Sequence, residues 1–241
     1  MKNLTLFACS FLLAAALQAQ IIHVPADYLT IQQGINAANP GDTVLVADGT
    51  YTEQINFLGK KPLMVASEFI IDGNESHISS TIIDGSQAPN PDSASVVYFI
   101  SGEDSTSVLC GFTITGGKGT YLPVFPDLEA GGILVWNSGA KFRNNMITGN
   151  TLDDSDYPES AGAYGGAACC YSYDQFGTYT ENWIIFENNE ISGNAVTTDH
   201  LYAFGGGLAC IGNIILRHNT IEGNSSIQTT SSTGSSVGSG G

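Results

Sequence analysis

Apolar residues in this chain fall in short runs rich in β-branched and aromatic side chains, and Gly, Asn, Asp and Ser separate the runs. Runs of this length and composition, bounded by turn-forming residues, predict β-strands. The clearest of them occupy residues 43–46, 63–66, 81–83, 96–100 and 108–114. We therefore expect an all-β fold.

One segment near the N-terminus has a helical period instead. Ile31 and Ile35 fall on one face of a helix, and Thr30 with Gln33 has the spacing of a capping box. An Asn-Pro-Gly-Asp sequence follows directly and ends such a helix. The sequence predicts one helix near 30–38, ahead of the strands.

The second half of the chain repeats one phrase, in which an apolar residue is followed by an Asn pair or His-Asn, an Ile and a final Gly-Asn. Its copies lie at 142–150, 186–194 and 216–224, and a glycine pair precedes each copy at 131–132, 165–166 and 206–207. A phrase repeated with spacers of variable length is typical of stacked coils.

Within one coil we expect three strands, at about 133–136, 140–144 and 146–148. Side chains of a strand alternate between its two faces, which divides each coil into inward and outward positions. The inward set is predicted to be Ile133, Val135, Phe142 and Ile147, then Ala167, Cys169, Phe186 and Ile191, then Leu208, Cys210, Leu216 and Ile221. Leu134, Trp136 and Cys170 are placed on the outer surface.

The asparagines of the phrase have a structural interpretation. Equivalent residues of stacked coils lie about 4.8 Å apart, a distance at which side-chain amides hydrogen-bond along the stack. Two such ladders are predicted, one of Asn145, Asn189 and Asn219 and one of Asn150, Asn194 and Asn224.

Long spacers separate the coils. We expect loops at 118–130, 151–164 and 195–205 to leave the stack at one corner, and an insertion at 171–182 to leave at another. The two sets would flank the sheet that begins at the glycine pairs.

The first twenty residues have the form of a secretory signal peptide, with Lys2 before an apolar stretch at 4–17. This predicts a secreted or cell-surface protein, and no later segment has the length of a membrane span. The folded domain is expected over 21–226. The Ser- and Gly-rich stretch 227–241 is either a tail or, as we favour, the start of a further coil in a truncated chain, whose open last coil would self-associate.

Charge and cysteine content narrow the partners. Seven basic residues against 23 acidic ones give a net charge of −16, which disfavours nucleic acid and anionic membrane surfaces. It also disfavours polyanionic glycans unless a divalent cation such as Ca²⁺ bridges the two. Cys110, Cys169, Cys170 and Cys210 could form disulfides after export or remain buried thiols.

Residues 24–51 and the repeated phrase resemble right-handed parallel β-helix proteins of the pectin-lyase-like superfamily. The resemblance implies a right-handed helix with three strands per coil and an N-terminal capping helix. That superfamily includes lyases, hydrolases, esterases, tailspikes and non-catalytic surface proteins, so the resemblance is nearly silent on activity. In its polysaccharide-cleaving members the substrate lies along the first sheet, between loops from its two edges.

Catalytic residues remain unassigned, because the polygalacturonase pattern of Asn-Thr-Asp, paired Asp and Gly-His-Gly is absent, as is the Arg-x-Pro-x-x-Arg of pectate lyases. Aromatic faces suit sugar rings, although such loops also pack on their own rings. The candidate substrate-binding residues are Trp136, Tyr157, Tyr171, Tyr173, Asp174 and Tyr202.

The acidic loop with Asp153, Asp154 and Asp156 is a candidate Ca²⁺ site, with solvated charge and catalytic carboxylates as alternatives. No other cofactor is expected. The sequence thus favours a secreted β-helix module that binds extracellular polysaccharide or forms part of a cell-surface protein. The alternative is a Ca²⁺-assisted polysaccharide lyase or glycoside hydrolase.

Overall fold

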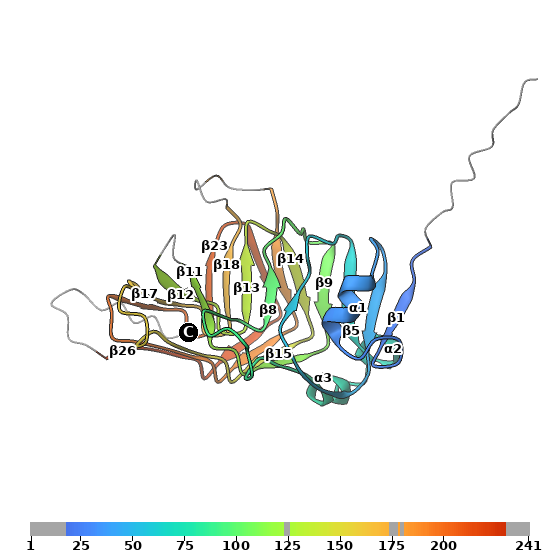
Figure 1. Ribbon diagram of the computed structural model, residues 1–241, viewed down its shortest axis with the longest axis horizontal. Coiled ribbons are helices and arrows are strands. Elements are labelled where there is room, and N and C mark those ends of the chain that lie inside the picture. The colour runs from blue at the N-terminus through green and yellow to red at the C-terminus, as the bar shows by residue number, and fades with distance from the viewer. Residues whose placement is uncertain (1–17, 123–125, 174–177, 179–180, 230–241) are drawn as a thin grey trace, which may run out of the picture.

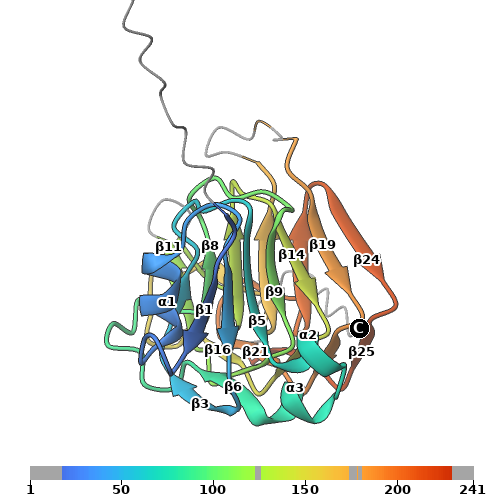
Figure 2. The same cartoon turned by 90° about the vertical axis from the view of Figure 1, so that its right-hand side faces the viewer.

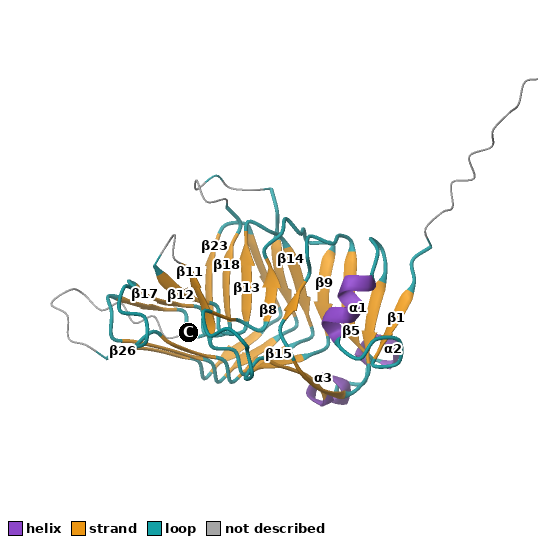
Figure 3. Ribbon diagram, in the orientation of Figure 1, coloured by secondary structure: helices purple, strands orange, loops and turns teal. Residues whose placement is uncertain are grey.

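Strands of successive coils lie side by side along the long axis of the molecule (Figures 1 and 3). The computed structural model describes residues 18–122, 126–173, 178 and 181–229. Almost all strand pairs are parallel, and the exceptions involve one strand, β11. The predicted all-β parallel β-helix is confirmed.

Three long sheets form the body. The β14 sheet has the order β1 (Ile21–Val24), β2 (Thr43–Val46), β5 (Leu63–Ser67), β9 (Ser107–Cys110), β14 (Ala140–Arg143), β19 (Ile184–Glu187) and β24 (Ile214–Arg217). The β15 sheet has the order β3 (Gly49–Thr52), β6 (Thr81–Asp84), β10 (Thr113–Thr115), β15 (Met146–Thr148), β20 (Glu190–Ser192) and β25 (Thr220–Glu222). The β13 sheet has the order β4 (Ile55–Asn56), β8 (Val97–Phe99), β13 (Ile133–Trp136), β18 (Ala168–Tyr171) and β23 (Leu208–Ile211).

The spacers at one corner contain paired strands, so their prediction as loops was wrong for these parts. One arm sheet has the order β7 (Ser93–Ala94), β11 (Gly119–Leu122), β12 (Asp127–Glu129), β17 (Gly162–Tyr164) and β22 (Tyr202–Phe204). The other consists of β16 (Thr151–Asp153), β21 (Ala195–Thr198) and β26 (Ser225–Gln228). We call both sheets together the arm, which projects at the left of Figure 1.

The arm forms because stacking gives the backbone of each excursion a partner in the next coil. Its strands have their own small core of Leu128, Leu152, Ala163, Val196 and Ala203. Buried residues alternate with exposed ones in β16 and with partly buried ones in β21, which is the pattern of a half-buried strand.

Helix α1 (Ile31–Ala37) lies beside β1 at the N-terminal end of the stack (Figure 2). The Thr30 hydroxyl accepts a hydrogen bond from the Gln33 backbone N–H at 3.2 Å, and Ile31 and Ile35 are fully buried. Two short helices, α2 (Phe69–Asp72) and α3 (Ser76–Ser80), connect β5 to β6. Helix α1 thus begins where the capping residues predicted.

The core between the three long sheets contains a column of aromatic side chains. Phe142 is in register with Phe186, and Phe186 with Leu216, as predicted. Ring centroids of Phe57 and Phe99 are 4.0 Å apart, those of Phe99 and Phe142 are 5.2 Å apart, and those of Phe142 and Phe186 are 4.7 Å apart. Each coil therefore packs its large side chain on that of the previous one.

One coil is shifted by a residue from the prediction. Cys170 pairs with Val135 and with Cys210 and lies in the inner core, whereas Cys169 pairs with Leu134 and lies in a cluster outside it. The inward placement of Cys169 and the outward placement of Cys170 were therefore wrong. All four cysteines in the described part of the chain are free thiols.

The cause of the shift is the glycine corner that joins the arm to the β13 sheet. Gly131 is level with Gly166 and not with Gly165, because the Ile133 N–H donates to Ala167 O at 2.9 Å. The backbones approach closely here: a Cβ added to Gly131 would lie 2.2 Å from Gly166 O, and one added to Gly166 would lie 2.2 Å from Gly206 O. A register slip of one residue moves every following side chain to the opposite face.

Both predicted asparagine ladders are present. The Asn145 side chain donates to Asn189 Oδ1 at 3.1 Å, and that of Asn189 donates to Asn219 Oδ1 at 2.9 Å. Backbone N–H groups of the same residues donate to the same oxygens at 3.0 and 2.9 Å. The left-handed backbone of this corner falls one residue earlier, at Asn144 and Asn188. The second ladder, of Asn150, Asn194 and Asn224, has the same pattern.

Replacing Asn189 by Ala should lower the free energy of unfolding by about 2–3 kcal/mol, because buried donors and acceptors on both sides lose their partner. Urea unfolding followed by circular dichroism measures the change. The control is Glu190→Ala, at the next and exposed position. Equal effects of the two substitutions would contradict the ladder's energetic role.

A chain ending at Gly241 should self-associate through its last described coil. Among the described residues, strands β23, β24, β25 and β26 lie at the ends of their sheets, and Leu216 is 51% exposed. Unpaired strand edges with exposed apolar side chains are templates for association. Sedimentation velocity over a concentration series should show oligomers, fewer of them for Leu216→Glu. A monomer at every concentration would contradict this expectation.

Candidate functional site

An apolar cluster covers the outer side of the β13 sheet where the sheet meets the arm. Its buried members are Tyr98, Ala130, Leu134, Cys169 and Tyr171, and the partly buried Trp136, Tyr164, Tyr173 and Ala209 pack against them. We call this cluster the aromatic face. Most of its residues come from β13, β18 and β23, at the positions that alternate with core residues, while Ala130 and Tyr164 belong to the arm side. Two surfaces thus meet at an aromatic corner.

Three of the predicted binding residues come together on this face. Trp136 is in register with Tyr171, and their ring centroids are 5.2 Å apart at an interplanar angle of 73°. Tyr173 is 6.3 Å from Trp136 and 5.2 Å from Tyr171, measured between ring centroids. Asp174, predicted beside them, lies outside the described residues.

The other two predicted aromatic residues are placed differently. Tyr202 is 45% exposed and stacks on Phe204 at 5.8 Å, and Phe204 stacks on Tyr164 of the aromatic face at 5.5 Å. A row of rings therefore leads from the corner along the arm to Tyr202.

Tyr157 is partly buried and packs against the small core of the arm. Its ring stacks on Tyr121 with centroids 4.7 Å apart. Its hydroxyl donates to Asp92 Oδ1 at 3.2 Å and is the same distance from Pro91 O. The prediction that Tyr157 lines the same cleft is not supported by these contacts, because the residue is engaged by the chain ahead of β7.

A buried carboxyl lies under the aromatic face, and sequence reasoning missed it. Glu129 is 2% exposed, and its Oε1 accepts a hydrogen bond from the Tyr171 hydroxyl at 2.9 Å. Its Oε2 is buried and has no hydrogen-bond partner. Burial raises the pKa of Glu129 from 4.5 to about 7; the Tyr171 hydroxyl opposes this rise and the charge of Asp127 adds to it. The Cys169 thiol nearby has a pKa well above its usual value, because of burial and then the charge of Glu129.

The strand register of the arm is the feature from which Glu129 could have been predicted. Glu129 pairs with Tyr164, and Tyr164 pairs with Phe204, so an acid stands where the next two coils have an aromatic ring. Once the arm is recognised as stacked strands, this exception is readable from the sequence. Treating the spacers as loops concealed it.

A carboxyl whose pKa is near 7 can keep or release a proton at neutral pH, which is the property of a general acid or base. Ordinary glycoside hydrolysis needs a second carboxyl group roughly 5 to 9.5 Å from the first. Asp127, on the same strand, is the neighbouring acid, and its own pKa is raised by burial and by the charge of Asp154. The corner therefore holds two carboxyl groups of altered acidity.

The three predicted calcium ligands do not converge. Asp153 and Asp156 are exposed, and Asp153 Oδ1 accepts from the Ser155 N–H at 3.1 Å, whereas Asp154 is fully buried. Consecutive residues leaving a strand point to opposite sides, which separates Asp153 from Asp154. Asp154 instead groups with Asp199 and His200, and the ligand-type atoms of the three lie within 4.8 Å of one another.

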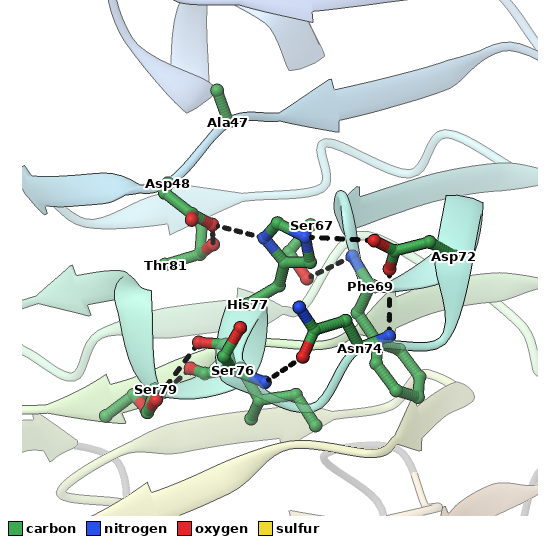
Figure 4. Close-up of polar contacts among 12 residues, drawn as sticks. Ala47, Asp48, Ser67, Phe69, Asp72, Asn74, Ser76, His77, Ser79 and Thr81 are labelled. Atoms are coloured by element: carbon green, nitrogen blue, oxygen red, sulfur yellow. Dashed lines mark hydrogen bonds and ion pairs between the residues drawn. The ribbon is translucent and has the colours of Figure 1, made fainter.

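A second polar cluster lies at the opposite end, where α2 and α3 cover the corner before β6 (Figure 4). His77 Nδ1 is 2.7 Å from Asp48 Oδ1, and its Nε2 is 3.5 Å from Asp72 Oδ2. The hydrogen bond with Asp48 is the main cause of the raised pKa of His77. The Thr81 hydroxyl also donates to Asp48 Oδ1, at 3.2 Å. Both ring nitrogens thus have acidic partners, and the cluster ties α3 to the segment between β2 and β3.

Fold and site together define a class of protein: a parallel β-helix whose coils extend into a stacked arm, with an aromatic face at the corner. The chain belongs to the DUF1565 family, described as a protein of unknown function, whose profile matches residues 24–239. No curated protein and no solved structure matches it. The described residues include no helix with the length and apolar character needed to cross a membrane.

The pH dependence of stability should report Glu129. Folding raises the pKa of Glu129, so the folded state favours the protonated carboxyl. The contribution of Glu129 to the free energy of unfolding is therefore fully present below pH 4.5 and is lost as the pH rises through about 7. Compared with Glu129→Gln, the wild type should lose roughly 3 kcal/mol of unfolding free energy over this range.

Urea unfolding of both proteins from pH 4.5 to 8 measures the difference. Glu190→Gln, an exposed carboxyl on β20, serves as the control. A difference between wild type and Glu129→Gln that stays constant with pH would contradict the raised pKa.

Proposed function

We propose that this chain is an exported β-helix module that binds an extracellular polysaccharide at the aromatic face. The observation that carries the proposal is the packing of Trp136, Tyr171 and Tyr173 together at the corner between the β13 sheet and the arm. Aromatic rings offer a large apolar area with a polar rim, which suits the faces of sugar rings.

The direction of the face supports a polymeric ligand. Equivalent residues of successive coils are about 4.8 Å apart, so contacts repeat along the helix axis. Trp136, the buried Tyr171 and the exposed Ile211 are equivalent in this sense, as are Tyr164 and Phe204 on the arm side. A chain of sugars lying along the axis would meet similar surfaces at successive coils, whereas a single small ligand would use only one of them.

Charge favours a neutral polysaccharide. The chain carries a net charge of −16, and Asp127 and Glu129 lie next to the aromatic face. A polyanionic glycan would meet repulsion there unless a divalent cation bridged it. Secretion, which the signal-peptide pattern of residues 1–20 predicts, would bring the module into contact with such polymers.

A polysaccharide-cleaving enzyme is the second candidate, and Glu129 is the observation that favours it. Its carboxyl has a pKa of about 7 and bonds to Tyr171, a residue of the proposed binding face. Glu129 would serve as the general acid and Asp127 as the second carboxyl. If this is correct, Glu129→Gln should abolish reducing-sugar release while leaving polysaccharide binding intact.

The two tryptophans of the chain offer a matched test of binding. Trp136→Ala should weaken binding of a neutral polysaccharide by about 1–3 kcal/mol, roughly 5- to 150-fold, because the indole loses its stacking area. Trp183 precedes β19 of a different sheet and is 46% exposed, so Trp183→Ala should leave affinity unchanged.

Affinity electrophoresis through gels containing β-glucan, xylan, mannan or polygalacturonate measures these affinities. Two results would contradict the proposed neutral-glycan site: retardation by polygalacturonate alone, or an equal loss of polysaccharide affinity in Trp136→Ala and Trp183→Ala.

A further inference from the structure

Three potential metal ligands from two neighbouring coils converge on the arm. Asp154 directly follows β16, and Asp199 and His200 follow β21. The register Asp153–Thr197 places Asp154 beside Thr198, one residue before Asp199. One ligand-type atom from each of the three residues lies within 4.8 Å of the other two.

The carboxylate of Asp154 is buried with one oxygen unmatched. The residue is 0% exposed, and its Oδ2 accepts from the Thr198 hydroxyl at 2.8 Å and from the Ser160 hydroxyl at 3.1 Å. Its Oδ1 is buried and has no hydrogen-bond partner. Among the described residues no Lys or Arg forms an ion pair with Asp154. Burying a charged oxygen without a partner is costly, so the site calls for a cation.

A second carboxyl strengthens this requirement. Asp127, in the coil before, feels the charge of Asp154, and its own Oδ1 is also buried without a hydrogen-bond partner. Like charges at a buried site repel each other. A bound divalent ion would offset both the desolvation and the repulsion.

The ligand turn is held in place by its own hydrogen bonds. The Thr198 hydroxyl that donates to Asp154 also accepts from the His200 N–H at 2.9 Å. The Gln228 side chain of the next coil donates to His200 O at 2.7 Å. His200 Nε2 is 3.2 Å from Asp199 Oδ1, so the imidazole and this carboxylate already face each other. Such supporting bonds orient metal ligands in known sites.

The donor set selects the kind of ion. Ca²⁺ and Mg²⁺ take oxygen ligands, whereas imidazole together with carboxylates suits Zn²⁺ and related first-row ions. In a tetrahedral site with ligand bonds of about 2.1 Å, neighbouring ligand atoms lie about 3.4 Å apart, so side-chain movements of about 1 Å bring these three atoms onto one ion. We propose that Asp154, Asp199 and His200 bind a divalent transition-metal ion of the Zn²⁺ type, with at least one coordination position left for water or a ligand.

The test is Zn²⁺ titration by isothermal calorimetry of the purified, EDTA-treated protein. The wild type should bind one Zn²⁺ per chain, and Asp154→Asn and His200→Ala should each weaken binding at least about tenfold, because even the outer partners of metal ligands contribute that much. The matched control is His77→Ala, since Asp48, Glu68 and His77 form a similar group in which both ring nitrogens of the histidine have acidic partners and Asp48 is exposed. It should bind Zn²⁺ like the wild type.

Thermal unfolding gives an independent measurement. Zn²⁺ should raise the Tm of the wild type and of His77→Ala but not that of Asp154→Asn or His200→Ala. Without metal, Asp154→Asn should be at least as stable as the wild type, because an amide keeps both hydroxyl bonds and removes the buried charge.

Three outcomes would overturn the proposal. Unchanged Zn²⁺ affinity in both Asp154→Asn and His200→Ala would place the ion elsewhere. Loss of binding in His77→Ala alone would assign it to the other cluster. Binding of Ca²⁺ more tightly than Zn²⁺ by the wild type would exclude the transition-metal assignment.

Discussion

The register of backbone hydrogen bonds between one coil and the next is the constraint on which the rest of this structure depends. Because the strands are parallel and in register, a residue meets its equivalent in the neighbouring coil at about 4.8 Å. The Phe142–Phe186 stack, the two asparagine ladders and the Tyr164–Phe204 stack are all products of this single repeat distance. The polar ladders then reinforce the register, since an amide displaced by one position would lose bonds on both of its sides.

The same constraint explains why the arm exists. Excursions of different length leave the stack between β15 and β18 and between β20 and β23, yet their strands pair because both ends of each excursion are already aligned. Polar residues needed for a site can then come from different coils and still meet, as Asp154 meets Asp199 and His200. Both the aromatic face and the group of Asp154, Asp199 and His200 consist of side chains that are far apart in the sequence and adjacent in the stack.

The success of sequence-based prediction followed the strength of the repeat. The phrase at 142–150, 186–194 and 216–224 repeats an apolar residue, asparagines and a Gly-Asn pair at fixed offsets. These repeated residues made the Phe142–Phe186–Leu216 stack and both ladders predictable. The glycine corner contains few distinctive residues. The prediction aligned Gly165 instead of Gly166 with Gly131, and this error assigned Cys169 and Cys170 to the wrong faces of their strand. The arm strands are short and rich in polar residues, which is the composition of loops, and their pairing comes only from tertiary stacking. The buried state of Glu129 depends on that stacking and was therefore hidden.

The close approach of backbones at Gly131, Gly166 and Gly206 has a consequence for how such a chain can lengthen. Duplicating the gene segment for one complete coil preserves the meeting of glycine with glycine at every level, so the copy fits the stack immediately. Inserting a residue at the corner itself would instead press a side chain into a carbonyl oxygen about 2.2 Å away. Lengthening by whole coils is therefore sterically allowed. The outer turns of the arm lie away from this column of glycines, so they can vary in length and change the surface of each new coil.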